Sequence, residues 1–108
     1  MATLYLMNSP VLPSFGQYQF EGPITTLKAR QLVSGGFVSA IGHEGAAALL
    51  SELLSQQVEM NRHPICLKAG DKALVLRLSQ RLPEGQILSY RELIDIPFEL
   101  GLLTCLRN

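Results

Sequence analysis

The sequence predicts a single α/β (α+β) domain spanning residues 1–108, with about five strands in a mixed sheet and two to three helices. The length of 108 residues fits one compact domain, since domains commonly span about 100–200 residues. Apolar residues make up 47% of the chain and charged residues 17%, a balance typical of a globular protein. Strand-type and helix-type segments alternate along the chain, which favours helices packed on a sheet.

The first half of the chain contains two strand patterns and two helix patterns. Residues 3–7 predict a strand that ends at a turn signal, and residues 14–23 form a polar, glycine-bearing connection. Thr25 or Thr26 caps a helix that stops at two glycines, residues 35–36. Residues 37–41 predict a buried strand. A helix with one apolar face follows, and its apolar positions recur at i, i+3 and i+4: Ala46, Ala47, Leu49, Leu50, Leu53 and Leu54.

The second half begins with a predicted strand over residues 64–67 and a tight turn over 68–71. Strong alternation over 71–80 then suggests a hairpin, with Leu74, Leu76 and Leu78 toward the core and Val75, Arg77, Ser79 and Arg81 on the other face. Ser89 is a cap for a short helix over 90–94, and residues 98–106 predict a closing strand.

Charge and cysteine content limit the classes of partner and compartment. Nine Lys and Arg against nine Asp and Glu give a formal net charge of zero, which argues against a protein that coats long nucleic acid. No apolar run reaches the ~18–20 residues of a membrane span. Cys66 and Cys105 form no C-x-x-C pair, and the chain shows no secretory leader, so we expect a cytoplasmic protein whose cysteines fill the core. The apolar surplus for so small a domain suggests a homodimer.

The search for known catalytic motifs is mostly negative. The chain has no phosphate-binding glycine loop, no zinc-protease motif and no serine-nucleophile motif. Asp71 and Asp95 stand in no group with metal-ligand spacing, so we expect no metal and no cofactor. Neither cysteine has the basic or helix-start surroundings that activate a thiol.

His43 is the strongest candidate for chemistry, because it stands where a predicted strand gives way to a helix. Helix N-termini present backbone N–H groups without internal partners and attract phosphate. With the arginines and Glu84, His43 fits metal-free cleavage of an RNA phosphodiester, in which the 2′-hydroxyl attacks and histidine protonates the leaving 5′-oxygen. The plainer interpretation is that His43 only caps the helix and that Arg77 and Arg81 lie on a solvated strand face.

Five segments, spread nearly from end to end, resemble a family of small viral and mobile-element proteins that includes the type III anti-CRISPR ring nucleases. They are residues 4–9 (LYLMNS), 37–44 (FVSAIGHE), 61–62 (NR), 70–75 (GDKALV) and 80–85 (QRLPEG). The resemblance implies an intertwined homodimer that binds cyclic tetra-adenylate, a second messenger of type III CRISPR defence. It also implies metal-independent cleavage of that ring to short linear adenylates with 2′,3′-cyclic phosphate ends.

Carried over by motif, the resemblance makes His43 the general acid, Arg81 the contact to the scissile phosphate and Glu84 the residue that orients or tunes them. The ligand contacts it implies are Asn8, Ser9, Arg62, Gln80 and the backbone N–H groups at Gly45. The chain departs from the family where small hydroxyl residues often follow the His-acid pair, because Gly45, Ala46 and Ala47 stand there. This departure favours the main alternative, a non-catalytic regulator that binds a cyclic nucleotide, nucleic acid or protein.

Overall fold

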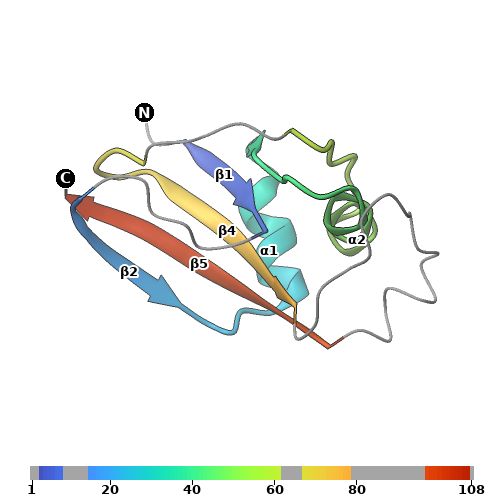
Figure 1. Ribbon diagram of the computed structural model, residues 1–108. Helices are drawn as coiled ribbons and strands as arrows, with labels where there is room; N and C mark the ends of the chain where they lie inside the picture. Colours follow the sequence, from blue (N-terminus) through green and yellow to red (C-terminus); the bar gives the residue numbers. More distant parts are fainter. Residues whose placement is uncertain (1–2, 9–14, 62–66, 79–96, 108) are drawn as a thin grey trace.

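One five-stranded mixed sheet, in the order β2-β5-β4-β1-β3, forms the centre of the protein (Figure 1). The computed structural model describes residues 3–8, 15–61, 67–78 and 97–107. In chain order the elements are β1 (Leu4–Met7), β2 (Gln17–Glu21), α1 (Thr26–Val33), β3 (Val38–Ser39), α2 (Glu44–Leu54), β4 (Lys72–Leu78) and β5 (Phe98–Arg107). The predicted α+β domain with five strands and two helices is confirmed. The predicted helix over 90–94 lies outside the described residues.

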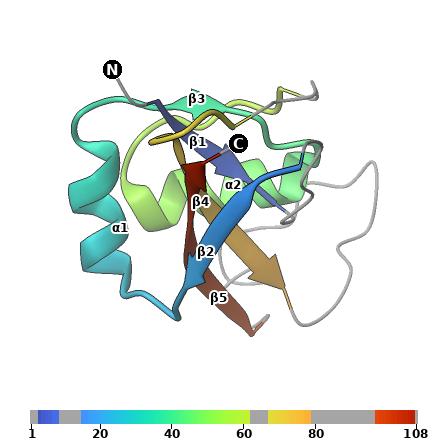
Figure 2. The ribbon, with the colours of Figure 1, turned by 90° about the vertical axis from the view of Figure 1, so that its left-hand side faces the viewer.

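Both helices cover the same face of the sheet, as Figures 1 and 2 show together. The main core lies between them and the strands, and it includes Leu6, Leu74, Leu76 and Leu100 from the sheet. The predicted apolar positions of α2 are all buried in this layer: Ala46, Ala47, Leu49, Leu50, Leu53 and Leu54. The helical periodicity therefore identified the packed face of α2 correctly, because a helix of this spacing has only one apolar side.

The opposite face of the sheet carries a second, smaller apolar cluster. Met7, Ala73, Val75, Leu103 and Cys105 are buried there together with Leu67. Cys105 is a free thiol with 1% exposure, so its predicted role as a core filler is confirmed. Cys66 lies outside the described residues. Within β4 the alternation thus separates two apolar layers rather than a core and a solvent face, and Arg77 on the second face is exposed. Ser79 and Arg81, which were predicted on that face, lie outside the described residues.

The ends of α1 follow the predicted signals. The Thr25 hydroxyl accepts a hydrogen bond from the Lys28 N–H at 3.0 Å, which caps the helix. After the helix, Gly36 has φ of +105° and donates its N–H to the Val33 carbonyl at 3.0 Å. Glycine tolerates this left-handed backbone conformation, so the chain can turn back toward the sheet there.

The structure corrects the prediction that residues 14–23 form only a connection. Residues 17–21 are strand β2, which pairs antiparallel with β5 at the outer edge of the sheet. Four of its five residues are exposed, so the strand is held mainly by backbone hydrogen bonds to β5. An edge strand needs little apolar surface, and for that reason its sequence carries a weak strand signal.

Two further predictions about strands are wrong. The strand expected over 37–41 contains only Val38 and Ser39, because Ile41 leaves β1 and forms an isolated parallel bridge with Met60. The hairpin expected between residues 64–67 and β4 is also wrong, since β1 and β5 occupy both edges of β4 from Lys72 to Val75. The turn over 68–71 does form, with the Asp71 N–H donating to the Lys68 carbonyl at 2.8 Å. Residues 64–66 lie outside the described part of the chain.

Within the described ranges, neither helix is long and apolar enough to cross a membrane.

Candidate functional site

The strands β1, β3 and β4 run parallel to one another, and the candidate site lies at the end of the sheet where these three strands finish. β1 pairs parallel with β3 on one side and with β4 on the other. Asn8 directly follows β1, and His43 lies four residues beyond β3. In sheets of parallel strands, ligands bind outside the carboxyl ends of the strands. The carboxyl ends of these strands are therefore the expected position for a ligand site in this fold.

His43 is the N-cap of α2. Its backbone is extended, with φ of −141° and ψ of 129°, and its Nδ1 atom accepts a hydrogen bond from the Gly45 N–H at 3.0 Å. This bond satisfies one of the N–H groups that the first turn of a helix leaves without an internal partner. The predicted position of His43 at the start of the helix is confirmed, and so is its capping role.

The capping bond determines which nitrogen of the His43 ring carries hydrogen. Because Nδ1 accepts, a neutral ring has its proton on Nε2. Nε2 is buried and has no hydrogen-bond partner in the part of the chain that the structure describes. A buried polar group without a partner costs about 1–3 kcal/mol, so a ligand atom that accepts from Nε2 would recover that cost.

Both backbone and side-chain hydrogen bonds hold the segment between β3 and His43. Ala40 donates its N–H to the Leu6 carbonyl at 2.9 Å, and the Ile41 carbonyl accepts from the Asn61 N–H at 2.8 Å. The Asn8 side-chain carbonyl accepts from the Gly42 N–H at 3.1 Å. From the other side, the Asn61 side-chain amide donates to the Ser39 carbonyl at 2.8 Å, and the Ser39 hydroxyl donates to the Glu59 carbonyl at 2.6 Å. This segment and His43 therefore form one connected unit with the end of β1.

The structure brings three of the predicted site residues together: Asn8, His43 and Gly45. Gly45 is buried, and its N–H already donates to His43. The other predicted site residues lie outside the described residues, and their roles stay predictions: Ser9, Arg62, Gln80, Arg81 and Glu84. Asn61 was not predicted as part of the site, because its contact to Ser39 joins residues 22 positions apart.

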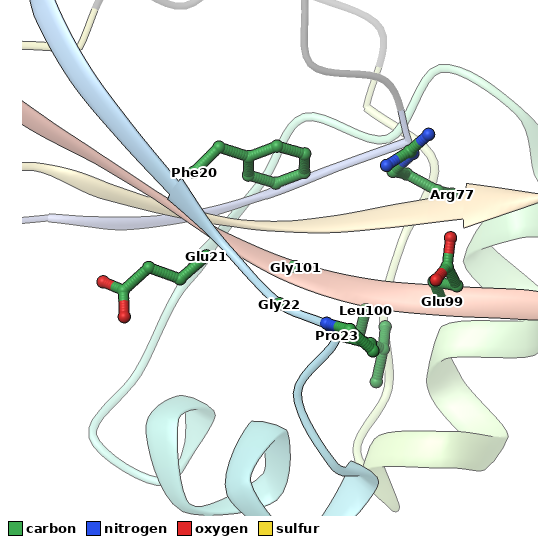
Figure 3. Close-up of a pocket in the computed structure, with 8 residues that line it drawn as sticks. All are labelled: Phe20, Glu21, Gly22, Pro23, Arg77, Glu99, Leu100 and Gly101. Atoms are coloured by element: carbon green, nitrogen blue, oxygen red, sulfur yellow. The ribbon is translucent and has the colours of Figure 1, made fainter.

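Arg77 lies on the other face of the sheet from the helices and is not grouped with His43. It is opposite Glu99 in the pairing of β4 with β5, and the two charged side chains border a hollow of about 170 Å³ (Figure 3). Phe20 and Gly101 line the same hollow (Figure 3). The predicted solvent-face position of Arg77 is thus confirmed, while a role in a cluster with His43 is not.

Comparison with known proteins places the chain among viral and bacterial homologues of unknown function. It is 35% identical over 104 residues to ORF117 of Acidianus two-tailed virus, which covers 90% of this chain and 88% of that protein. It is 34% identical to protein 26 of Sulfolobus islandicus filamentous virus over 92% of this chain and 88% of the relative. YddF of Bacillus subtilis is 34% identical over 91% of this chain and 93% of its own length.

A solved structure and a family model agree with these relatives. The structure of B116 of Sulfolobus turreted icosahedral virus (STIV) matches with a TM-score of 0.76 and 25% identity, over 95% of this chain and 99% of that one. The model of the STIV B116-like family matches residues 4–100, which include all the described elements except residues 101–107 of β5. The chain therefore belongs to the STIV B116-like family.

Proposed function

We propose that this protein is a metal-independent ring nuclease that cleaves cyclic tetra-adenylate to short linear adenylates with 2′,3′-cyclic phosphate ends. The observation that carries the proposal is the Nε2 atom of His43, which is buried and has no hydrogen-bond partner among the described residues. The His43 imidazole lies at the end of the sheet where the parallel strands β1, β3 and β4 finish. The resemblance of residues 37–44 and 80–85 to ring nucleases supports the same assignment.

In the proposed reaction the substrate supplies its own nucleophile. The 2′-hydroxyl oxygen forms a bond to phosphorus while the bond from phosphorus to the 5′-oxygen breaks. The 2′-hydroxyl proton passes to solvent. His43 acts in its protonated form, with hydrogen on both ring nitrogens, so it gives the Nε2 proton to the leaving 5′-oxygen and is left as a neutral ring. Imidazole suits this role because it takes up and releases a proton near neutral pH.

The remaining predicted residues stabilise and hold the substrate in this proposal. Arg81 stabilises the negative charge that builds up on the phosphate, and Glu84 orients these groups. Ser9, Arg62 and Gln80 contact the cyclic tetra-adenylate, together with the backbone at Gly45. These assignments rest on the sequence motifs.

A symmetric substrate fits the predicted homodimer. A ring of four identical nucleotides can share the two-fold axis of two identical subunits, so that each His43 faces a symmetry-related phosphate. Cleavage of the cyclic tetra-adenylate would switch off type III CRISPR signalling. In a viral protein this suppresses the defence of the host, and in a host protein it resets the defence.

A second candidate function is binding of a cyclic nucleotide without cleavage. The observation that favours it is the bond between Gly45 and His43. A protonated ring would carry hydrogen on both nitrogens, and its Nδ1–H would then oppose the Gly45 N–H instead of accepting from it. The acid form of His43 must give up this capping bond, and no hydroxyl side chain stands at residues 45–47 to replace it.

The test incubates purified protein with cyclic tetra-adenylate in EDTA and compares the wild type with His43→Asn and His43→Ala. Asparagine retains a capping oxygen, whereas alanine loses the cap and about 1 kcal/mol of stability. We expect EDTA-resistant turnover in the wild type and a loss of about 100-fold or more in both variants, since general acid catalysis contributes about 10²–10⁴-fold.

Three results would contradict the proposal in different ways. Turnover by His43→Asn within a few-fold of the wild type would leave His43 with only its capping role. Tight binding without turnover in the wild type would establish the second candidate. Neither binding nor turnover would exclude both.

A further inference from the structure

The last rung between β1 and the segment after β3 is made by a side chain. Ala40 donates its backbone N–H to the Leu6 carbonyl at 2.9 Å. In a parallel ladder, the next bond donated by the same segment would come from the residue two positions further along, and would run from the Gly42 N–H to the Asn8 carbonyl. Gly42 does donate there, but to the side-chain Oδ1 of Asn8, at 3.1 Å. The side chain thus takes the place of the backbone carbonyl.

Asn8 connects β1 with the short segment that leads from β3 to His43. β1 pairs with β3 at Tyr5 and Leu6 and with β4 from Leu4 to Met7, so this strand is fixed on both sides. β3 is only two residues long and lies at the edge of the sheet. The bonds from Asn61 hold Ser39 and Ile41, whereas the bond from Asn8 holds Gly42, the residue directly before His43.

We propose that Asn8 is a positioning residue, which fixes the peptide at Gly42 and thereby the direction of the His43 ring. This inference rests on the proposed function, because it concerns the residue that would donate the proton. On the helix side, the Gly45 N–H anchors the neutral ring, and the protonated ring gives up that bond. Asn8 supplies the anchor on the sheet side, and this anchor does not depend on the protonation of the ring. A displacement of about 1 Å at a reacting group can reduce the rate by about 100-fold.

The test compares Asn8→Asp, Asn8→Leu and Thr25→Ala. Aspartate keeps an oxygen that accepts from Gly42, and leucine has similar size without an acceptor. Thr25→Ala is the matched control, because it also removes one side-chain oxygen that accepts from a backbone N–H, at the far cap of α1. Two measurements do not depend on catalysis: hydrogen exchange of the Gly42 amide, and the NMR signals of the His43 ring.

We expect Asn8→Leu to speed exchange at Gly42, to shift the His43 ring signals and to lower kcat by about 10–100-fold with little change in KM. Asn8→Asp should retain the Gly42 protection and recover most of the kcat that leucine loses. Its KM should rise, because the added charge repels the phosphates. Thr25→Ala should lower Tm without moving the His43 signals.

Unchanged Gly42 exchange and unchanged His43 signals in Asn8→Leu would overturn the inference. It would also be overturned if Asn8→Asp protected Gly42 but lost as much kcat as Asn8→Leu, since Asn8 would then act by contact with the substrate. If the wild type does not cleave cyclic tetra-adenylate, the proposed function fails. The exchange and NMR measurements would still decide whether Asn8 positions His43.

Discussion

At the scale of single residues, Asp71 stabilises the start of the sheet through both of its carboxylate oxygens. It is only 8% exposed; Oδ1 accepts from the Thr3 N–H at 2.9 Å and Oδ2 from the Lys68 N–H at 3.0 Å. We expect Asp71→Ala to lower the free energy of unfolding by about 2–4 kcal/mol, since each such bond to a charged group contributes about 1.5–3 kcal/mol and two bonds to one carboxylate contribute less than their sum. Urea unfolding measures the change.

The control for Asp71 is Glu99→Gln, which removes an exposed carboxylate on β5. Surface changes of this kind usually alter stability by less than about 0.5 kcal/mol. Asp71→Asn should fall between the two, because its amide retains one accepting oxygen but turns an N–H₂ group toward a second donor. Equal effects of Asp71→Ala and Glu99→Gln would show that the buried hydrogen bonds do not matter.

At the scale of elements, the absence of a side chain at Gly101 determines how β2 packs beside β5. A Cβ atom added there would lie 2.5 Å from Cε1 of Phe20 and 3.3 Å from the Glu21 carbonyl oxygen. The Phe20 ring therefore covers the backbone of Gly101, on the face turned away from the helices (Figure 3). β2 is an edge strand with little burial of its own, and this contact adds to the packing of the half-buried Tyr18 against the second apolar cluster.

We expect Gly101→Ala to lower the free energy of unfolding by about 1–3 kcal/mol, the usual cost of forcing extra volume into a packed contact. The Phe20 ring can rotate away, so the loss should be strongly non-additive with Phe20→Ala. A double-mutant cycle with thermal unfolding measures the coupling. Additive effects would mean that ring and glycine do not interact, and Leu27→Ala, at an exposed site on α1, is the control.

At the scale of the whole molecule, the chain leaves large apolar side chains exposed. Phe15 is 100% exposed, Leu106 on β5 is 53% exposed and Phe20 on β2 is 42% exposed. The predicted homodimer would provide a partner for such surface, and the proposed reaction uses its two-fold symmetry. We expect light scattering after size exclusion to give about twice the chain mass of 11.9 kDa at micromolar concentration. A mass of one chain at every concentration would contradict the shared site.

Local patterns in the sequence were sufficient for those parts of the fold that depend on neighbouring residues. The apolar spacing of α2, the Thr25 cap and the position of His43 before the helix were all predicted correctly, because caps and helix faces arise within a few residues. The edge strand β2 was missed, because its stability comes from hydrogen bonds to β5, more than 80 residues away along the chain.

The sequence by itself determined the class of fold, the buried face of α2 and the position of His43 at the start of that helix. The tertiary structure alone decided that β4 lies between β1 and β5, that Arg77 faces away from the helices, and that Asn8 binds Gly42. These features depend on which strands become neighbours. Backbone pairing and hydrogen bonds between distant residues leave no periodic pattern in a sequence, and the site at His43 is built from both.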